Sequence, residues 1–588
     1  MTDKQLYREL QESIKNSCNS RDRQLRVNEI NQRNCLYKNL EIGSVVPIVE
    51  TLPFAINPVE YFARLSDHGR KKNSLLFESA SLVPKYGERS LGSADPCLKI
   101  VGKGEYFEIS ALNKTGIRLI DFLKNDFDFC DSVEYSKDSI KGKLKPKRGA
   151  VSEDERLKLK NHTDILRTIA FKFKPVSKPF IPYCGLFGAI SYDFIDQFED
   201  LPKNKKDILN DADYIFYFVD NLFMVDHKEQ KTYFAANALV TEDFDDVHAE
   251  CISKIKNYRT LVSEKSNFEN TDGKNITNGN NTKNKINKNI ENINNEYNLN
   301  KNKAISAVKF ESDTSKEEFI ETVSKIKKHI LAGDVYQCVI SRTISTEFNG
   351  DAFDIYRKLR DVNPSPYMFY INNSDGVVLG ASPEMSLRVE GDKKKIVEIR
   401  PIAGTKPRGI SSGKIDMDLD SRYEIELKTD AKEIAEHTML VDLARNDMAR
   451  ISKPGTRYVD EPYTIEKYSH VQHLVSNVRG VLKDDLDALH AYLATMNMGT
   501  LTGAPKVEAM KLIRLYEKTK RGFYGGAVGY LTPSGDMDSA ILIRSIRVKD
   551  NKAYVRVGAG IVYDSNPESE FIETERKSKA CLKAIEGA

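Results

Sequence analysis

The chain has 588 residues, 40% of them hydrophobic, and a net charge of +3, a composition typical of a large globular protein. Lysines outnumber acidic residues within 264–309, and that segment carries the excess charge, so we expect no nucleic-acid-binding surface. There is no apolar run long enough to cross a membrane, no signal-peptide pattern, and no C-x-x-C pair among the eight cysteines. A cytoplasmic protein that binds no membrane is therefore predicted.

Strands dominate the predicted N-terminal region, residues 46–262, which follows a polar extension of low order over residues 1–45. Runs of β-branched and aromatic residues predict strands at 75–81, 106–112, 214–227 and 231–239. The last two are expected to lie side by side and buried.

An asparagine- and lysine-rich segment, residues 263–311, separates this region from residues 312–588. It has too few apolar side chains to offset its ordering entropy, which predicts a disordered insert. Helices and strands are mixed beyond it. The whole pattern predicts an α+β protein in which large antiparallel sheets pack as a sandwich with helices outside.

The first helix after the insert has clear boundaries in the sequence. Ser315 and Glu318 form a capping box, apolar residues follow at helical spacing, and Gly333 ends the helix. A strand over 334–343 comes next, and its alternation places Gln337 on one face with two valines.

A later predicted helix carries carboxylates among leucines. Asp430 and Glu433 form the capping box that starts it, and Glu436 shares a face with leucines. An ionised carboxylate in apolar surroundings is costly unless a cation or hydrogen bonds compensate it. Either a salt bridge or a divalent metal ion would compensate the Glu436 carboxylate, and the helix alone does not decide between them.

A second acidic helix lies near the C-terminus. Asn566 and Pro567 start it, and Glu570, Glu573 and Lys577 share one of its faces. Alone, this is a typical solvated face. Together with the two glutamates of the preceding helix, it would offer an oxygen-only site that suits Mg²⁺.

Glycine turns beside cations are candidate sites for an anionic substrate. They lie at 399–409, 498–506 and 558–560, where bare backbone N–H groups can approach a carboxylate or phosphate. Arg544 and Tyr524 fall in neighbouring segments with the same bias. No P-loop and no nucleophile elbow is present in the sequence.

Taken in order, five segments resemble the chorismate-utilising enzymes: PIAGT, EHTMLVDLARND, MNMGTLTGAPK, YGGAVGY and GAGIVYDS. The five segments resemble most closely the component I of anthranilate synthases, and the N-terminal segments LLFESA, GLFGAISYD and FEDLP are similar to those of the anthranilate and aminodeoxychorismate branch of the family. The resemblance covers roughly residues 45–262 and 312–588. It implies the fold of that family, with a regulatory N-terminal region and a chorismate-binding catalytic region.

The resemblance also implies a metal and a set of substrate contacts. Glu436 and Glu573 would hold Mg²⁺, with Glu433 and Glu570 beside them. The positions matching chorismate contacts are Gly404, Thr405, Thr500, Tyr524, Arg544, Gly558, Ala559, Gly560 and Lys577.

Four residues would be catalytic by the same resemblance: Thr500, Glu384, His473 and Gln337. Glu384 matches the general acid that protonates the departing C4 hydroxyl. His473, which strand alternation alone would assign to the core, matches the histidine linked to the elimination step. Gln337 stands where water-activating members have lysine, and Ala403 where others have a nucleophilic lysine, so ammonia is the implied attacker at C2.

The implied reaction is amination of chorismate at C2 followed by elimination of pyruvate to anthranilate, the first committed step of tryptophan synthesis. A glutamine amidotransferase subunit would supply ammonia in a heterotetramer of two large and two small subunits. Tryptophan would inhibit through Glu78, Ser79, Pro364, Ser365 and Pro366. Two alternatives stay open: an aminodeoxychorismate synthase component I, and an inactive tryptophan-sensing subunit.

Overall fold

The computed structural model describes residues 40–80, 88–146, 152–175, 184–203, 206–263, 308–411, 414–468 and 471–588. Residues 1–39 of the predicted extension and 264–307 of the predicted insert lie outside the described residues. Among the helices that are described, none combines the length and the apolar character needed to span a bilayer.

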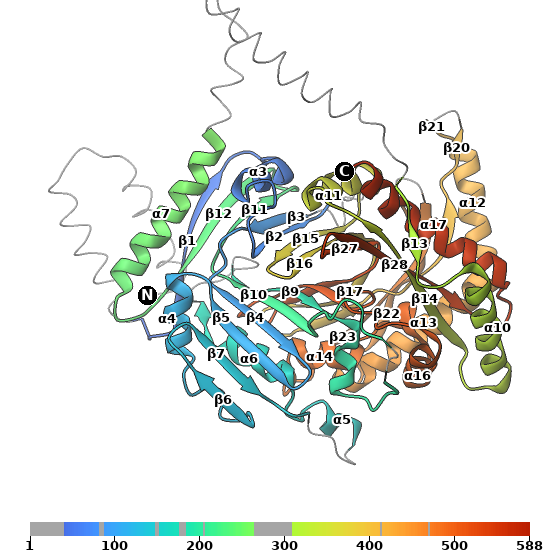
Figure 1. Cartoon of the computed structure of the whole chain (residues 1–588), viewed down its shortest axis with the longest axis horizontal. Helices are drawn as coiled ribbons and strands as arrows, with labels where there is room; N and C mark the ends of the chain where they lie inside the picture. Colours follow the sequence, from blue (N-terminus) through green and yellow to red (C-terminus); the bar gives the residue numbers. More distant parts are fainter. Residues whose placement is uncertain are drawn as a thin grey trace, which may run out of the picture.

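Two large sheets form the body of the molecule (Figure 1). In spatial order the first sheet contains β13 (Glu311–Ser312), β14 (Gln337–Glu347), β28 (Lys552–Ile561), β27 (Ser545–Lys549), β16 (Gly376–Ser382), β15 (Tyr367–Asn373), β2 (Ser74–Glu78), β3 (Arg89–Ser93), β11 (Asn221–Asp226), β12 (Lys231–Leu239), β1 (Ser44–Leu52) and β8 (Lys174–Pro175), with β24 (Gly503–Ala504) beside β14. Its neighbours are antiparallel except for β1 and β8.

The second sheet is antiparallel throughout. Its order is β19 (Ile402–Pro407), β23 (Val471–Val481), β18 (Ile396–Ile399), β17 (Met385–Glu390), β26 (Met537–Ile541), β25 (Ala527–Leu531), β9 (Gly185–Ile190), β10 (Tyr214–Val219), β4 (Leu98–Lys103), β5 (Tyr106–Ala111), β7 (Ser139–Lys143) and β6 (Ser132–Tyr135), with β22 (Tyr458–Lys467) beside β23. A separate small hairpin joins β20 (Ile410–Ser411) and β21 (Lys414–Ile415).

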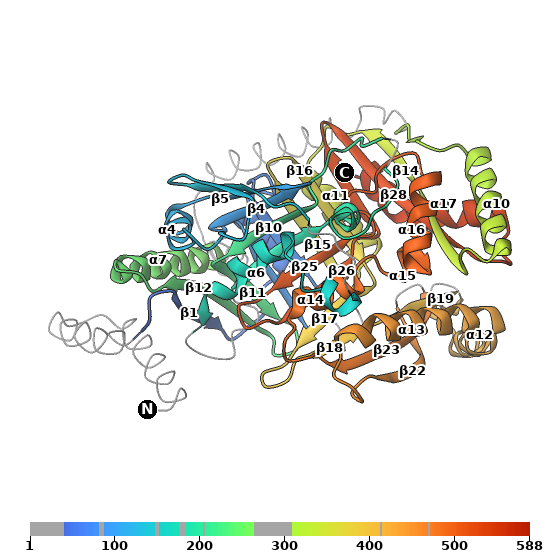
Figure 2. The ribbon, with the colours of Figure 1, turned by 90° about the horizontal axis from the view of Figure 1, so that it is seen from below.

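Helices lie outside the two sheets. They are α3 (Pro58–Leu65), α4 (Lys114–Phe122), α5 (Glu153–Arg156), α6 (His162–Lys172), α7 (Phe244–Ser263), α10 (Lys316–Ala332), α11 (Ala352–Val362), α12 (Met417–Thr429), α13 (Ala431–Ile451), α14 (Ala488–Thr495), α15 (Gly499–Thr502), α16 (Lys506–Tyr516) and α17 (Pro567–Glu586), with a 3-10 helix, η1, at Tyr192–Gln197. Figure 2 shows α12, α13, β22 and β23 on one side of the molecule, below α10, α16 and α17.

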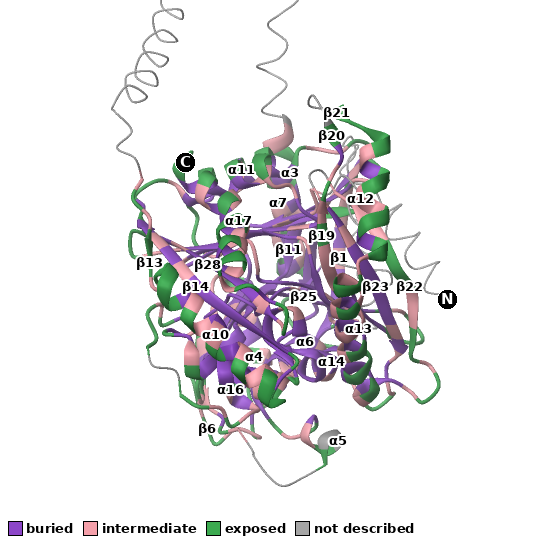
Figure 3. Ribbon diagram, turned by 90° about the vertical axis from the view of Figure 1, so that its right-hand side faces the viewer, coloured by how far each residue is buried: buried purple, intermediate pink, exposed green. Residues whose placement is uncertain are grey.

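Apolar side chains from both sheets meet in one core between them. Leu75 and Phe369 of the first sheet pack there with Phe187 and Ala540 of the second. The outer face of the first sheet is covered by α3, α7, α11 and α17, and their exposed sides face solvent (Figure 3). The predicted α+β sandwich with external helices is confirmed.

The N-terminal and C-terminal regions build both sheets jointly. In the first sheet β2 pairs with β15, so that Glu78 lies opposite Met368. In the second sheet β9 pairs with β25, so that Ile190 lies opposite Ala527. The sequence boundary between the two regions therefore runs through each sheet.

One predicted strand, 214–227, is in fact two strands in different sheets. Its first half, β10, belongs to the second sheet, and only its second half, β11, pairs with β12 as expected. The chain changes sheets at Asp220, a buried carboxylate that accepts a hydrogen bond from Lys254 at 2.8 Å. Apolar continuity in the sequence could not reveal this crossing, because both halves are equally buried.

The predicted helix starts are largely confirmed. The capping box of α10 forms between Ser315 and Glu318, and Gly333 closes the helix with a φ of 84°. Asp430 caps α13 by accepting from two backbone N–H groups. Glu433 does not complete a capping box with Asp430. Its carboxylate lies beside the β19 turn, where its Oε2 would be only 2.8 Å from a Cβ atom added to Gly404.

Candidate active site

Two helices present four carboxylates to the same region of the molecule. Glu433 and Glu436 project from α13, and Glu570 and Glu573 from α17. Burial is the main cause that raises the pKa of the first three, and repulsion across the two helices adds to it, from Glu573 on Glu433 and from Glu570 on Glu436. These groups therefore remain close enough to interact electrostatically.

Lysines accompany the four carboxylates at the edge of the cluster. Lys432 Nζ lies 3.9 Å from Glu436 Oε1, and Lys577 Nζ lies 3.4 Å from Glu573 Oε1. Both contacts are long and partly exposed, so neither cancels the repulsion among these half-buried carboxylates. No three His, Cys, Asp or Glu side chains in the described ranges converge into a ready-made metal site. The oxygen-only donor set nevertheless fits a hard divalent cation.

Glu384 begins the turn into β17 and is only 6% exposed. Burial raises its pKa to about 8, although the Thr500 hydroxyl, the Ile402 backbone and the charge of Lys577 act in the opposite direction. At neutral pH this carboxyl is therefore largely protonated, as a general acid must be.

Gln337 Oε1 is a buried acceptor of the predicted site that has no hydrogen-bond partner among the described residues, whereas the Glu384 carboxyl group contacts the Thr500 hydroxyl and the Ile402 backbone. Leaving a buried acceptor unsatisfied costs about 1–3 kcal/mol, so a bound polar ligand would stabilise Gln337 in this position.

His473 lies on β23 opposite the β19 turn. Its Nδ1 is 3.1 Å from the carbonyl oxygen of Gly404 and 3.0 Å from Thr405 Oγ1. Because a carbonyl only accepts, this geometry assigns the proton to Nδ1 and leaves the Nε2 lone pair available. Burial lowers the pKa of His473, so the ring is neutral at physiological pH.

Gly558 and Gly560 of β28 present bare backbone to Tyr524 and Gln337, and we call this surface the glycine wall. A Cβ on Gly558 would lie 3.0 Å from Tyr524 Oη, and one on Gly560 would lie 2.7 Å from Gln337 Nε2. Bare backbone therefore lets these side chains approach the strand. The intervening Ala559 points into the hydrophobic core, so only its backbone can take part.

Two cations border the same wall. Lys577 Nζ donates to the carbonyl of Gly558 at 3.2 Å, and Arg544 Nη1 donates to the carbonyl of Lys577 at 3.0 Å. Arg544 has a φ of 50°, an unusual conformation for a non-glycine residue that functional sites often retain. The wall thus offers positive charge for an anionic ligand.

Sequence reasoning missed one charged residue of this site. Arg400 is 3% exposed, ion-paired with Glu466, and its charge lowers the pKa of both Glu384 and His473. It stands directly before the PIAGT segment, where the sequence pattern indicates a glycine turn flanked by cations but not a buried arginine.

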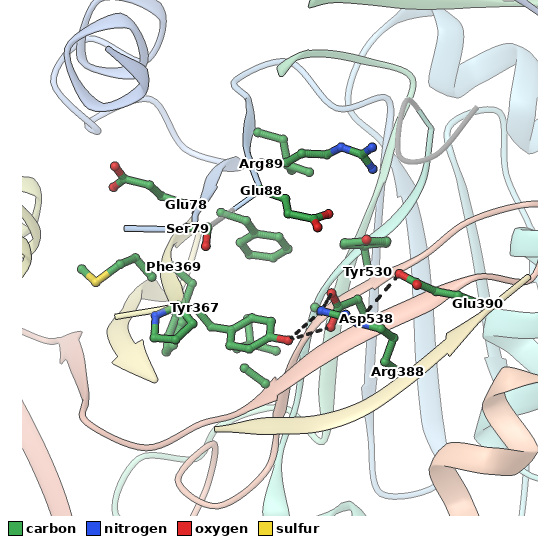
Figure 4. Close-up of a pocket in the computed structure, with 17 residues that line it drawn as sticks. Glu78, Ser79, Glu88, Arg89, Tyr367, Phe369, Arg388, Glu390, Tyr530 and Asp538 are labelled. Carbon is green, nitrogen blue, oxygen red and sulfur yellow. Dashed lines mark hydrogen bonds and ion pairs between the residues drawn. The ribbon is translucent and has the colours of Figure 1, made fainter. Parts of the chain in front are cut away.

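A separate cavity of about 240 Å³ contains part of the predicted inhibitor site (Figure 4). Glu78, Ser79 and Pro366 line it, whereas Pro364 and Ser365 do not. The carboxylate of Glu78 is already paired with α11, because it accepts hydrogen bonds from Arg360 Nε at 2.8 Å and from Tyr356 Oη at 2.8 Å.

Charged and aromatic side chains close the opposite end of this cavity. Arg388 of β17 pairs with Asp538 of β26 at 3.1 Å, and Tyr367 Oη donates to Asp538 at 3.2 Å. Figure 4 shows these contacts beneath Tyr530 and Glu390. The cavity combines aromatic faces with both signs of charge, which suits a small aromatic zwitterion.

Comparison with known proteins agrees with this geometry. The sequence family described as chorismate binding enzyme matches residues 138–583. Anthranilate synthase component 1 of Vibrio cholerae is 38% identical over 537 residues, which cover 91% of this chain and 95% of that protein. The corresponding protein of Escherichia coli is 38% identical over 531 residues, covering 90% and 94%. This chain belongs to the chorismate binding enzyme family.

Solved structures of chorismate-binding enzymes share the fold. Anthranilate synthase component I from Streptococcus pneumoniae superposes with a TM-score of 0.59 at 28% identity, covering 84% of this chain and 92% of that one. The menaquinone-specific isochorismate synthase of Escherichia coli reaches 0.56 at 15% identity, covering 94% and 98%, and shows likeness of fold alone. The expected family and its enzymatic nature are confirmed, while the roles of single residues stay predictions.

Proposed function

We propose that this chain is the synthase component of an anthranilate synthase. The observation that carries the proposal is the 38% identity to component 1 of the Vibrio cholerae enzyme across 91% of this chain. The unpaired buried acceptor of Gln337 and the raised pKa of Glu384 support it, because a substrate with polar groups to bind and a hydroxyl to protonate would use both.

In the first half-reaction ammonia adds at C2 of chorismate while the C4 hydroxyl departs as water. Glu384 donates the proton to that hydroxyl, which its raised pKa allows. Gln337 can orient ammonia but cannot accept a proton from water, so hydrolytic attack is disfavoured. Lys577 and Arg544 face the carboxylates of the substrate.

In the second half-reaction 2-amino-2-deoxyisochorismate loses pyruvate and becomes aromatic. A base must take the C2 proton as the bond between C3 and the enolpyruvyl oxygen breaks. His473 is suited to that step because its Nδ1 proton is held by Gly404, which leaves Nε2 as the acceptor.

Mg²⁺ would be held by Glu436 and Glu573, with Glu433 and Glu570 beside them, and would supply positive charge for binding a substrate carboxylate. The raised pKa values of Glu433, Glu436 and Glu570 support this assignment, because a cation would relieve the repulsion among them.

A second component supplies ammonia in this proposal. The relatives are named component 1, which supports a glutamine amidotransferase partner, and we expect two copies of each in a cytoplasmic heterotetramer. Tryptophan, as end-product inhibitor, would bind in the 240 Å³ cavity beside Ser79 and Pro366, with its charged groups near Arg388 and Asp538.

The deciding experiment incubates the purified chain with chorismate, Mg²⁺ and ammonium at alkaline pH. We expect anthranilate fluorescence and one pyruvate per anthranilate, measured with lactate dehydrogenase. Omitting chorismate or Mg²⁺ is the control. An aminated product that retains its enolpyruvyl group would identify an aminodeoxychorismate synthase, and no turnover at all would leave the inactive sensing subunit.

A further inference from the structure

A buried network of two arginines and one glutamate lies behind the glycine wall. Glu517, Arg521 and Arg556 are 4%, 3% and 8% exposed. Glu517 accepts from Arg521 Nη2 at 2.6 Å and Nε at 3.0 Å, and from Arg556 Nη2 at 2.7 Å. Burial alone would raise the pKa of Glu517, but the two guanidinium charges outweigh it and lower the pKa, so the carboxylate is ionised.

The remaining donors of Arg521 reach two backbone segments of the candidate active site. Nη1 donates to the carbonyl of Leu501 at 2.6 Å, directly after Thr500. Nη2 donates to the carbonyl of Val339 at 2.8 Å, two residues beyond Gln337 on β14. A single planar group therefore connects the segment that carries Thr500 with the strand that carries Gln337.

The same guanidinium also packs against aromatic rings. It lies 4.5 Å from the ring centroid of Tyr192 and 5.9 Å from that of Tyr524. Tyr192 in turn bonds Thr502 of the α15 segment at 3.2 Å. Arg521 thus touches, directly or through one neighbour, the segments that carry Gln337, Thr500 and Tyr524.

We propose that Arg521 is the positioning residue that fixes Gln337, Thr500 and Tyr524 relative to one another. The inference rests on the proposed function, because these three residues matter only if they face chorismate. A fork of five N–H donors can satisfy Glu517 and two carbonyls at once, which a lysine cannot do. A small displacement of a positioned group can lower turnover by about 100-fold.

Arg556 provides a matched control. It bonds the same glutamate, but its other donors go to Ser341 Oγ at 2.8 Å and to Thr519 Oγ1 and the carbonyl of Lys520. Replacing either arginine by lysine keeps the charge, loses the fork and leaves comparable buried acceptors unsatisfied. A purely structural role predicts that both variants behave alike.

The test measures kcat and KM for chorismate with ammonium, urea unfolding, and hydrogen exchange of residues 499–503 in R521K and R556K. Both variants should unfold at lower urea. Only R521K should lose kcat, by at least about 30-fold, and exchange these amides at least about tenfold faster. Equal effects in the two variants, or a kcat of R521K within threefold of wild type, would overturn the proposal.

Hydrogen exchange separates this inference from the proposed function. If the wild type does not convert chorismate, only the proposed function fails, and exchange in 499–503 still decides whether Arg521 holds that segment.

Chemical rescue gives a second, independent readout. Arg521 lines a cavity of about 190 Å³ with Tyr524 and Arg556, so a small guanidinium has space to enter beside it. Methylguanidinium should raise the kcat of R521A at least about tenfold and leave R556A unchanged. Rescue of both variants or of neither would contradict the positioning role; if R521A does not fold, R521K decides the question.

Discussion

At the scale of single residues, burial decides the state of the groups in the candidate active site. Gln337 Oε1 is buried without a hydrogen-bond partner in the described chain, and a ligand that donates to it would remove a cost of about 1–3 kcal/mol. Burial also raises the pKa of Glu384 to about 8, although the charges of Lys577 and Arg400 act in the opposite direction.

The ionisation of Glu384 predicts an alkaline limb in the pH profile. Because its pKa is raised, the carboxyl carries its proton below pH 8 and loses it above, so kcat measured at constant free ammonia should fall as pH rises through about 8. Glu384→Gln should lower kcat by about 10²–10⁴-fold and remove this limb. Glu347→Gln, at the exposed end of β14, is the control, and an unchanged limb in the first variant would contradict the assignment.

The carboxylate cluster predicts opposite effects of one substitution with and without metal. Glu436→Gln removes a repelling charge, so the metal-free variant should be at least as stable as wild type. Saturating Mg²⁺ at 100 times its Kd should stabilise wild type by about 2.7 kcal/mol and the variant hardly at all. Thermal unfolding with and without Mg²⁺ measures both effects. Asp442→Asn, on the same helix and paired with Arg445, should respond as wild type does.

At the scale of elements, α13 is anchored to the segment that carries Thr500. Lys506, the first residue of α16, bonds Asp447 of α13 at 2.6 Å and the carbonyl of Thr495 at 3.0 Å. Both charged side chains are nearly buried. Removing one partner of a buried ion pair is costly because the other charge is left uncompensated.

Lys506→Met should therefore destabilise the protein by about 3–5 kcal/mol, because Asp447 would remain buried without its cation. Lys511→Met on the same helix removes an exposed pair with Glu508 and should change stability by less than about 0.5 kcal/mol. Urea unfolding of both variants checks this. Similar midpoints for the two would show that the buried pair does not anchor α13.

At the scale of the whole molecule, two strands join the cavity of Figure 4 to the candidate active site. β17 carries Arg388 in the cavity and follows Glu384, while Ile541 N, at the end of β26, donates to the carbonyl of Glu384 at 3.0 Å. Because Arg388 and Asp538 pair across these strands, a ligand that engages them can shift the position of Glu384.

Ser79→Ala should weaken inhibition by tryptophan while leaving the uninhibited rate within about twofold. Ser79 lines a cavity that none of the proposed catalytic or metal-holding residues lines, so the uninhibited rate should hardly change. Loss of one hydrogen bond to a charged group of the inhibitor should raise the inhibitory concentration about tenfold or more. Inhibition curves with Ser110→Ala, on β5, as control measure the effect. Unchanged inhibition would place tryptophan elsewhere.

The sequence determined the local features of this protein. Caps and glycine stops predicted α10, α13 and α17 because helix ends are satisfied by neighbouring residues. The motifs also predicted the family, and helical periodicity placed Glu433 and Glu436 close together on one side of α13.

Only the tertiary structure decided which segments meet. It assigned the apolar run at 214–227 to two sheets, turned Ala559 into the core, and separated Ser79 and Pro366 from Pro364 and Ser365. It also gathered Glu517, Arg521 and Arg556 behind the glycine wall. These outcomes depend on long-range pairing and packing, whose energies a local pattern does not contain.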